Sequence, residues 1–288
     1  EVVMPRFILA EFNTHRMLSR NSASSRAIPF EKMLKMVEET PFIPIAWQRD
    51  HKGMQGTEYL TDSIDIINCK NSWLEAAEYA VKQAKQLNAN NATKQLCNRL
   101  LEPFMYHKVL VTATEWENFF ALRCPRYNTS EGIYISRKEA LKAKNMFSET
   151  ALKNTYEDTL LNIEWLKCNQ GQAEIHMMAL AEAMWDAYNE STPKELKAGD
   201  WHIPFSDKLI YGKILDQCMP DLKADEVFDV SLASVKIATA MCARISYTVL
   251  GEEGKEPNYE NDIQLHDRLA KSGHWSPFEH CARVMNED

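Results

Sequence analysis

Residues 15–26 read HRMLSRNSASSR, a stretch that holds three arginines and four serines. Planar guanidinium groups bind phosphate through paired hydrogen bonds, and short hydroxyls with free backbone N–H groups complete a cradle for an anion. Taken alone, a stretch of this composition is most often a solvated loop. We expect residues 19–29 to be a polar loop, too rich in hydroxyl groups to pack as core. The anion-binding interpretation therefore depends on what else the sequence contains.

The bulk composition is that of a globular protein with an acidic surface. The chain has 288 residues, of which 45% are hydrophobic, and a formal net charge of −8. It begins at Glu1 without a Met, so its boundaries are provisional. No segment has the length and apolarity of a membrane span or the pattern of a secretion signal, so we expect a cytoplasmic protein, in the host cytoplasm if it is viral. The negative charge disfavours general binding to nucleic acid polymers, which needs clustered Lys and Arg, so an anionic ligand must meet a local basic pocket.

The cysteines suggest neither a disulfide framework nor a metal site. There are seven of them, widely spread and never arranged as CxxC. An odd number with this spacing favours reduced thiols. His274 and His280 are close in sequence, but no third and fourth ligand stand at zinc-binding distances, so we predict no metal.

Hydrophobic periodicity predicts a chain in which helices outnumber strands. Residues 5–17 are expected to form a short buried helix, and residues 106–113, YHKVLVTA, a strand. The charged residues 136–168 are expected to be helical, with few turn signals. Further helices are expected at residues 30–37, 71–87, 94–101, 115–123, 173–188, 230–245 and 262–271.

Four more sequence blocks accompany the first. Each has an ordinary explanation when taken singly: a hexapeptide such as NFFALR is an amphipathic turn, and GHWSPFEH fits a capped turn with a core histidine. The blocks are RLLEP at residues 99–103, NFFALR at 118–123, QAEI at 172–175, and ARIS at 243–246 followed by GHWSPFEH at 273–280.

Together the five blocks resemble the motifs of the flavin-dependent thymidylate synthases. In that family the first block reads Arg-His-Arg, seven residues, Ser and, two positions on, Arg. The residues of this chain that match are His15, Arg16, Ser24 and Arg26. Thr14 stands where the first Arg belongs, and Ser22 stands where an acidic residue is common.

The block order is permuted relative to most members, because ARIS and GHWSPFEH come last here. The chain is thus similar to a permuted, phage-like long form, and the site survives if its segments still meet in space. The resemblance implies an α+β fold, with a helix-rich single domain over residues 1–288 around a central, mostly antiparallel sheet. Residues 125–171 have no counterpart of this length in the family, and we expect a helical insertion at about 126–170 with a surface or assembly role.

The resemblance also implies roles for individual residues. The predicted catalytic residues are Arg123, which polarises the pyrimidine, Arg16 and Ser24. Thr14 puts one nucleotide or flavin contact in doubt, for which Arg20 could compensate. The predicted nucleotide-binding residues are Glu11, Arg16, Ser24, Ser25, Arg26, Arg99 and Arg123. The predicted flavin-binding residues are His15, Met17, Asn118, Ser246, His274, Ser276 and Glu279.

The implied activity is reductive methylation of dUMP to dTMP. The family uses FAD as cofactor, methylenetetrahydrofolate as carbon donor and NADPH as reductant, and it works as a homotetramer. No cysteine nucleophile is needed, although Cys124 beside Arg123 is the alternative to examine. Arginines are donors only, which suits the carbonyls of uracil, whereas Glu11 could accept from a cytosine amino group. A deoxycytidylate methylase or hydroxymethylase, an inactive nucleotide-binding relative and an unrelated helical binding protein therefore remain open.

Overall fold

The computed structural model describes residues 1–53, 56–219, 229–249 and 257–285. Within these ranges the protein is α+β, rich in helices, with small antiparallel sheets. The strands are β1 (Val2–Pro5), β2 (Ser19–Ser22), β3 (Tyr106–Thr112), β4 (Tyr127–Thr129), β5 (Gly132–Tyr134), β6 (Trp201–His202) and β7 (Ala282–Arg283). The α-helices are α1 (Leu9–Phe12), α2 (Phe30–Glu39), α3 (Ser63–Ala89), α4 (Lys94–Arg99), α5 (Glu117–Arg123), α6 (Arg137–Ala143), α7 (Glu149–Glu157), α8 (Thr159–Cys168), α9 (Ile175–Glu190), α10 (Tyr211–Cys218), α11 (Val230–Arg244) and α12 (Tyr259–Ser272). The 3-10 helices are η1 (Arg6–Ile8), η2 (Glu102–Phe104), η3 (Ser206–Lys208), η4 (Ile245–Tyr247) and η5 (Ser276–His280).

A three-stranded sheet lies at the centre, with β3 between β1 and β2 and both pairings antiparallel. Strand β3 confirms the prediction for residues 106–113. The prediction that residues 19–29 form a loop outside the core is wrong in two respects, since residues 19–22 are a strand and Ser25 is buried. The hydrogen bonds of a strand are made by its backbone, so a partner such as β3 can recruit a hydroxyl-rich segment that has no β pattern of its own.

Most predicted helices are present, and their limits differ for local reasons. Of residues 5–17, only the seven in η1 and α1 are helical. The helix predicted at 71–87 is part of the longer α3, which begins after Asp62. The Asp62 carboxylate accepts hydrogen bonds from the backbone N–H groups of Ile64 and Asp65, which satisfies donors that a helix start leaves unpaired.

The insertion is not helical throughout, because it opens with the β4–β5 hairpin before α6, α7 and α8. Gly132 in this hairpin has φ 147°, a conformation that side chains disfavour. Side chains of Ser136, Ser148 and Asp158 cap the starts of the three helices. The composition of the segment concealed this hairpin, whose strands are only three residues each.

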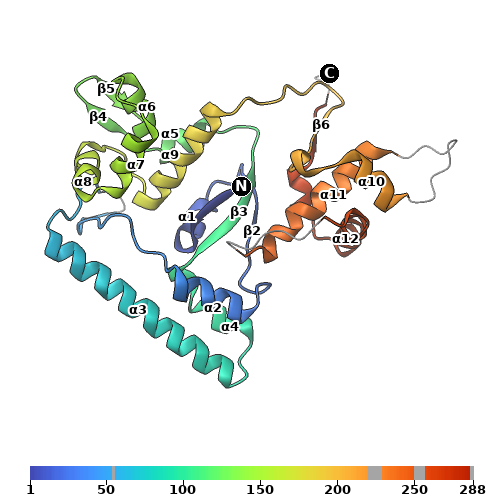
Figure 1. Cartoon of the computed structure of the whole chain (residues 1–288), viewed down its shortest axis with the longest axis horizontal. Coiled ribbons are helices and arrows are strands. Elements are labelled where there is room, and N and C mark those ends of the chain that lie inside the picture. Colours follow the sequence, from blue (N-terminus) through green and yellow to red (C-terminus); the bar gives the residue numbers. More distant parts are fainter. Residues whose placement is uncertain (54–55, 220–228, 250–256, 286–288) are drawn as a thin grey trace.

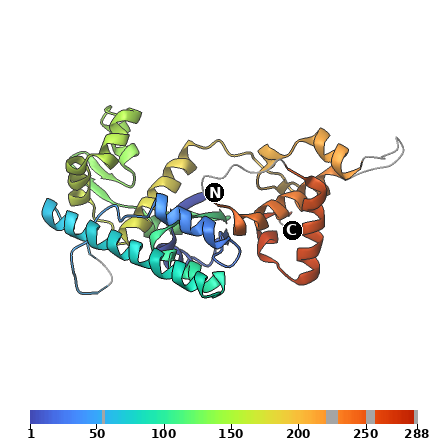
Figure 2. The ribbon, with the colours of Figure 1, turned by 60° about the horizontal axis from the view of Figure 1, so that its bottom comes forward.

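The insertion and the C-terminal helices lie on opposite sides of the central sheet. Figures 1 and 2 agree on this arrangement, with α6, α7 and α8 at one end and α10, α11 and α12 at the other. One hydrophobic core joins β1, α1 and β3 to α5 and α9, and another joins α2, α3 and α4. Leu110 of β3 packs with Cys242 and Ile245, which holds the C-terminal helices against the sheet.

Candidate active site

The C-terminal blocks lie against the strand and loop that carry the first block. The Ser24 N–H donates to the carbonyl of Ser246 at 2.8 Å. Asn21 Nδ2 donates to the carbonyl of Cys242 at 3.3 Å, although the two residues are 221 positions apart. On the neighbouring strand, Thr112 Oγ1 lies 2.8 Å from His280 Nδ1. Segments from both ends of the chain therefore meet along β2 and β3.

Arg123, at the end of α5, joins two other predicted site residues. Its Nε donates to His15 Nε2 at 2.8 Å, and its Nη1 donates to Glu11 Oε1 at 2.5 Å. Because Nε2 of His15 accepts, the proton of the neutral ring is on Nδ1. Arg123 Nη2 makes no hydrogen bond to the described residues, so it remains available as a donor. The cluster thus presents a guanidinium group that two partners hold in place.

Burial controls the ionisation of the two groups that face Arg123. It lowers the pKa of His15, and the nearby charges of Arg123 and Arg20 lower it further. Burial also raises the pKa of Glu11, against the opposing effect of Arg123 and with a smaller contribution from Glu174. A neutral His15 and an anionic Glu11 are the states in which both can accept from Arg123.

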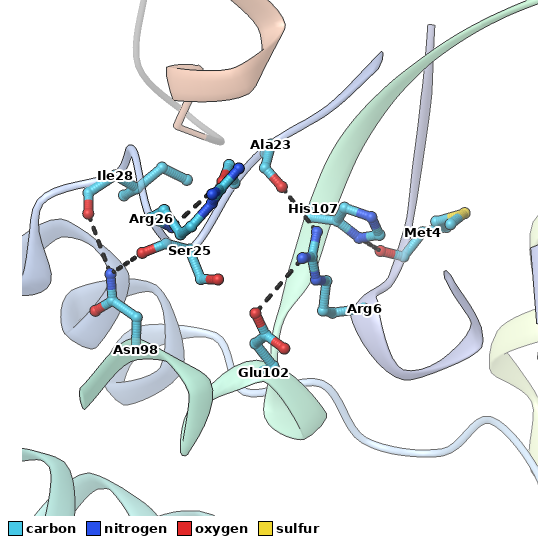
Figure 3. Close-up of polar contacts among 10 residues, drawn as sticks. Met4, Arg6, Ala23, Ser25, Arg26, Ile28, Asn98, Glu102 and His107 are labelled. Atoms are coloured by element: carbon cyan, nitrogen blue, oxygen red, sulfur yellow. Dashed lines mark hydrogen bonds and ion pairs between the residues drawn. The ribbon is translucent and has the colours of Figure 1, made fainter. Parts of the chain in front are cut away.

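The loop at residues 23–28 follows β2 and carries three predicted nucleotide-binding residues. Ser25 is buried, Ser24 is half-buried and Arg26 is exposed. The loop is fixed from below by Asn98 at the end of α4, next to the exposed Arg99 (Figure 3). It therefore brings Ser24, Ser25 and Arg26 close to Arg99, and through Ser246 to the C-terminal blocks.

Three of the residues predicted to bind flavin, His274, Ser276 and Glu279, are exposed near the C-terminal end. Ser276 and Glu279 lie on η5, and both are exposed. Burial lowers the pKa of Arg20 and Glu279 raises it, which places this carboxylate near the cation on β2. Trp275, between His274 and Ser276, leaves 60% of its surface exposed. Polar groups and an exposed apolar ring therefore lie side by side here.

Other predicted site residues are not connected to these groups. Arg16 and Asn118 are exposed, and their side chains make no hydrogen bonds to the described part of the chain. Met17 is 72% exposed. The ring of His274 turns to Ser272, with Nδ1 2.8 Å from Oγ. The structure thus places these four at the surface without joining them to the Arg123 cluster.

Cys124 does not have the surroundings of an activated nucleophile. Its side chain is buried, and burial together with Glu182, Asp186 and Glu139 raises its pKa to about 12. A thiolate is the reactive form of cysteine, so this thiol is held in its unreactive form. Cys124 lines a cavity of about 530 Å³ walled by Trp116, Phe120 and Trp185, and none of the predicted site residues borders it.

Three residues of the site were not predicted from the sequence. Arg6 Nη1 donates to the carbonyl of Ala23 at 2.7 Å, and Lys94 Nζ donates to that of Ala27 at 3.0 Å. Asn98 is fully buried. Only for Asn98 did the sequence hold a signal, since it interrupts the apolar face between Cys97 and Leu101.

Two other features bear on function. Across the described ranges, no cluster of three His, Cys, Asp or Glu side chains is arranged to hold a metal ion. Within the same ranges, none of the helices combines the length and apolarity needed to cross a bilayer.

Comparisons with known proteins give limited similarity. The sequence matches no protein-family model and no curated protein sequence. Among solved structures, the chain is similar to a UMP/dUMP methylase, PolB from Streptomyces cacaoi, bound with 5-Br UMP, at 19% identity and a TM-score of 0.35. The match covers 59% of this chain and 72% of that chain. A similarity of this extent does not assign a fold family or a function.

Proposed function

We propose that this protein catalyses the FAD-dependent reductive methylation of dUMP to dTMP, with methylenetetrahydrofolate as carbon donor and NADPH as reductant. The observation that carries the proposal is the contact between Ser24 and Ser246. It joins the loop of the first block to the ARIS segment from the other end of the chain, as a permuted sequence with one shared site requires.

The proposed nucleotide site combines an anion-binding loop with a hydrogen-bond donor for the base. Ser24, Arg26 and Arg99 would hold the phosphate, and Arg123 would reach a uracil carbonyl through its free Nη2. Negative charge would develop on the pyrimidine when a hydride adds to carbon 6, and it would be consumed as carbon 5 attacks the one-carbon unit. A guanidinium group held in advance by Glu11 and His15 would stabilise that charge without rearranging.

The residues near η5 fit a flat heteroaromatic ring that carries carbonyl groups. The exposed Ser276 and the half-buried Ser246 offer hydroxyl donors, and the exposed Trp275 offers a planar apolar surface. FAD would supply hydride transfer at this place. His274, Ser276 and Glu279 would bind and orient the cofactor, while Ser246 would link it to the nucleotide loop.

The first test is whether the purified protein binds FAD. We expect a flavin absorption spectrum with stoichiometric FAD, because two separate segments supply the proposed contacts. Replacing both His274 and Glu279 with Ala should abolish flavin retention and leave the circular dichroism spectrum unchanged, since both side chains are exposed. Equal FAD occupancy in the double variant would contradict the flavin assignment.

The second test identifies the base. Enzyme, FAD, NADPH and methylenetetrahydrofolate are incubated with deoxyuridylate or deoxycytidylate, and the product mass is measured. Our proposal expects a gain of about 14 mass units on deoxyuridylate only. Glu11 favours the second candidate, a cytosine-specific enzyme, because its free carboxylate oxygen could accept from the amino group of cytosine. Reaction of deoxycytidylate alone, or a gain of about 30 mass units from hydroxymethylation, would replace the substrate assignment.

We also propose a homotetramer as the functional unit. Arg16 follows His15, but its exposed side chain makes no hydrogen bond to the described residues, so it is free to reach a site shared with a neighbouring subunit. Light scattering should report four subunits in the active form. Full activity from a monomer would contradict this part of the proposal.

A further inference from the structure

Several backbone carbonyls of the loop at residues 23–28 accept hydrogen bonds from side chains of the elements that support the loop. Asn98 Nδ2 donates to the carbonyl of Ser25 at 2.8 Å and to that of Ile28 at 3.1 Å. Figure 3 shows Asn98 below the loop, with both carbonyls pointing to its amide nitrogen. A single side chain thus removes two carbonyl dipoles from the exposed side of the loop.

Two cations from other elements bind further carbonyls of the same loop. Arg6 Nη1 donates to the Ala23 carbonyl, and Lys94 Nζ donates to the Ala27 carbonyl. Glu102 lies 3.5 Å from Arg6 Nη2 and holds this guanidinium group in position (Figure 3). Three side chains from supporting elements therefore donate hydrogen bonds to four of the loop carbonyls.

The orientation of the Asn98 amide follows from this arrangement. Asn98 has no solvent exposure, and its Oδ1 has no hydrogen-bond partner among the described residues. A flipped amide would place Oδ1 against two carbonyl oxygens. An apolar side chain at this position would leave no buried oxygen without a hydrogen-bond partner. The amide group of Asn98 is therefore explained by its hydrogen bonds to the loop carbonyls and not by the packing around it.

Two backbone donors remain in the middle of the loop. The Ser25 N–H has no partner among the described residues, and the Arg26 N–H meets only Ser24 Oγ, at 3.3 Å. Arg26 is an exposed cation on the loop, and the exposed Arg99 follows Asn98 in the chain. Burial lowers the pKa of the Arg6 guanidinium group, and Arg99 lies close enough to lower it further. Adjacent N–H groups whose carbonyls point away form a concave site that favours anions.

We infer that Asn98, assisted by Arg6 and Lys94, is a positioning residue that makes the loop at residues 23–28 selective for a phosphate monoester. The inference rests on the proposed function for the identity of the nucleotide. It goes further by assigning phosphate selectivity to residues that touch the loop carbonyls and not the ligand.

The test replaces Asn98 with Leu, which removes the donor without changing the charge and suits the apolar neighbours Cys97 and Leu101. Binding of deoxyuridylate, deoxyuridine and inorganic phosphate is measured by calorimetry. We expect deoxyuridylate and phosphate to bind about tenfold more weakly and deoxyuridine to change less than about twofold. With deoxyuridylate as substrate, KM should rise while kcat at saturation stays within about twofold.

A surface variant keeps the inference testable if Asn98→Leu does not fold. Lys94→Met removes the contact to Ala27 at an exposed position, and Lys70→Met is the matched control, exposed on α3. Lys94→Met should weaken phosphate binding about threefold relative to Lys70→Met. Equal phosphate affinity in the two lysine variants, or equal losses for deoxyuridylate and deoxyuridine in Asn98→Leu, would overturn the inference.

The same measurements separate this inference from the proposed function. If the protein binds inorganic phosphate and Asn98→Leu weakens it, the positioning role stands even when no nucleotide is methylated. If deoxyuridylate is methylated but no variant alters phosphate affinity, the proposed function stands and the positioning role does not.

Discussion

The insertion and the loop at residues 23–28 both depend on arginines, but they use them in opposite ways. In the insertion, Arg137 is 4% exposed. Its Nε donates to Tyr127 Oη at 2.9 Å, and its Nη1 donates to the Thr155 carbonyl and to Asn162 Oδ1, both at 3.0 Å. Its backbone N–H donates to the buried carboxylate of Glu182 on α9 at 2.7 Å.

At the loop, by contrast, Arg26 and Arg99 are exposed, and neither forms an ion pair with a carboxylate of the described residues. The guanidinium group of Arg137 is satisfied by partners within the insertion, and the backbone N–H of Arg137 and the Tyr127 hydroxyl attach the insertion to Glu182 on α9. The charges at the loop are not satisfied, so they remain available to a ligand. In this protein, therefore, the hydrogen-bond partners of an arginine decide whether it stabilises the fold or remains available to a ligand, and the neighbouring residues in the sequence do not.

The largest effect should come from breaking the network of the insertion. Arg137→Ala removes the donors to Tyr127, Thr155 and Asn162 together with the nearby positive charge that favours the buried Glu182 carboxylate, and it should lower the free energy of unfolding by about 3–5 kcal/mol. Urea denaturation measures this. The control is Lys153→Ala, which removes an exposed ion pair with Glu157 and should cost less than about 1 kcal/mol. Equal stability losses in the two variants would show that the network is not a structural unit.

The next effect should appear in turnover rather than in stability. Arg123→Ala removes the proposed donor to the pyrimidine, and we expect kcat to fall by about 10²–10³-fold. The partly exposed pair with Glu11 contributes little to folding, so the free energy of unfolding should change by less than about 1 kcal/mol. A variant that lost stability but kept its turnover would assign Arg123 to the same structural class as Arg137.

A smaller effect should appear in the pH dependence of stability. Burial, with a contribution from Arg6, lowers the pKa of His107 to about 3. The unfolded chain takes up this proton near pH ~6.5, so stability should fall as the pH drops below that value, by up to about 1.4 kcal/mol per pH unit. His280, with its pKa lowered to about 4 by burial, acts in the same direction.

The variant His107→Gln should reduce this slope by about one proton between about pH 6 and pH 4. Urea denaturation at a series of pH values measures the slope. An unchanged slope would mean that His107 is protonated in the folded protein and that the polar cluster around Arg6 is more open than the structure has it.

The smallest effect is expected at Cys124, which directly precedes the insertion in the chain. Cys124→Ser should leave turnover within about threefold of the parent protein, because the buried thiol is kept protonated. Steady-state kinetics with deoxyuridylate measures this. A loss beyond about 1000-fold would instead favour covalent catalysis by this cysteine.

Local sequence patterns were sufficient to predict most of the helices, the strand β3 and the residues of the candidate site. Hydrophobic periodicity predicted helices such as α2 and α11, because a helix that buries one face has apolar residues at regular, short spacings in the sequence. The resemblance to known motifs also assigned His15, Ser24 and Arg123 to one predicted site. Their joint role stays a prediction, although the structure brings His15 and Arg123 into contact.

Contacts between distant segments could not be predicted in this way. The pairing of β2 with β3, the contact of Asn21 with Cys242 and the choice of the carbonyls that Asn98 binds could not be predicted from local patterns, because each depends on a partner far away in the chain. For Asn98 the local sequence showed only a polar residue on an apolar face. The β4–β5 hairpin was missed for a related reason, since strands of three residues are too short for a period of two to be read. Local sequence thus set which groups are present, and long-range packing set which of them have partners and which remain open to a ligand.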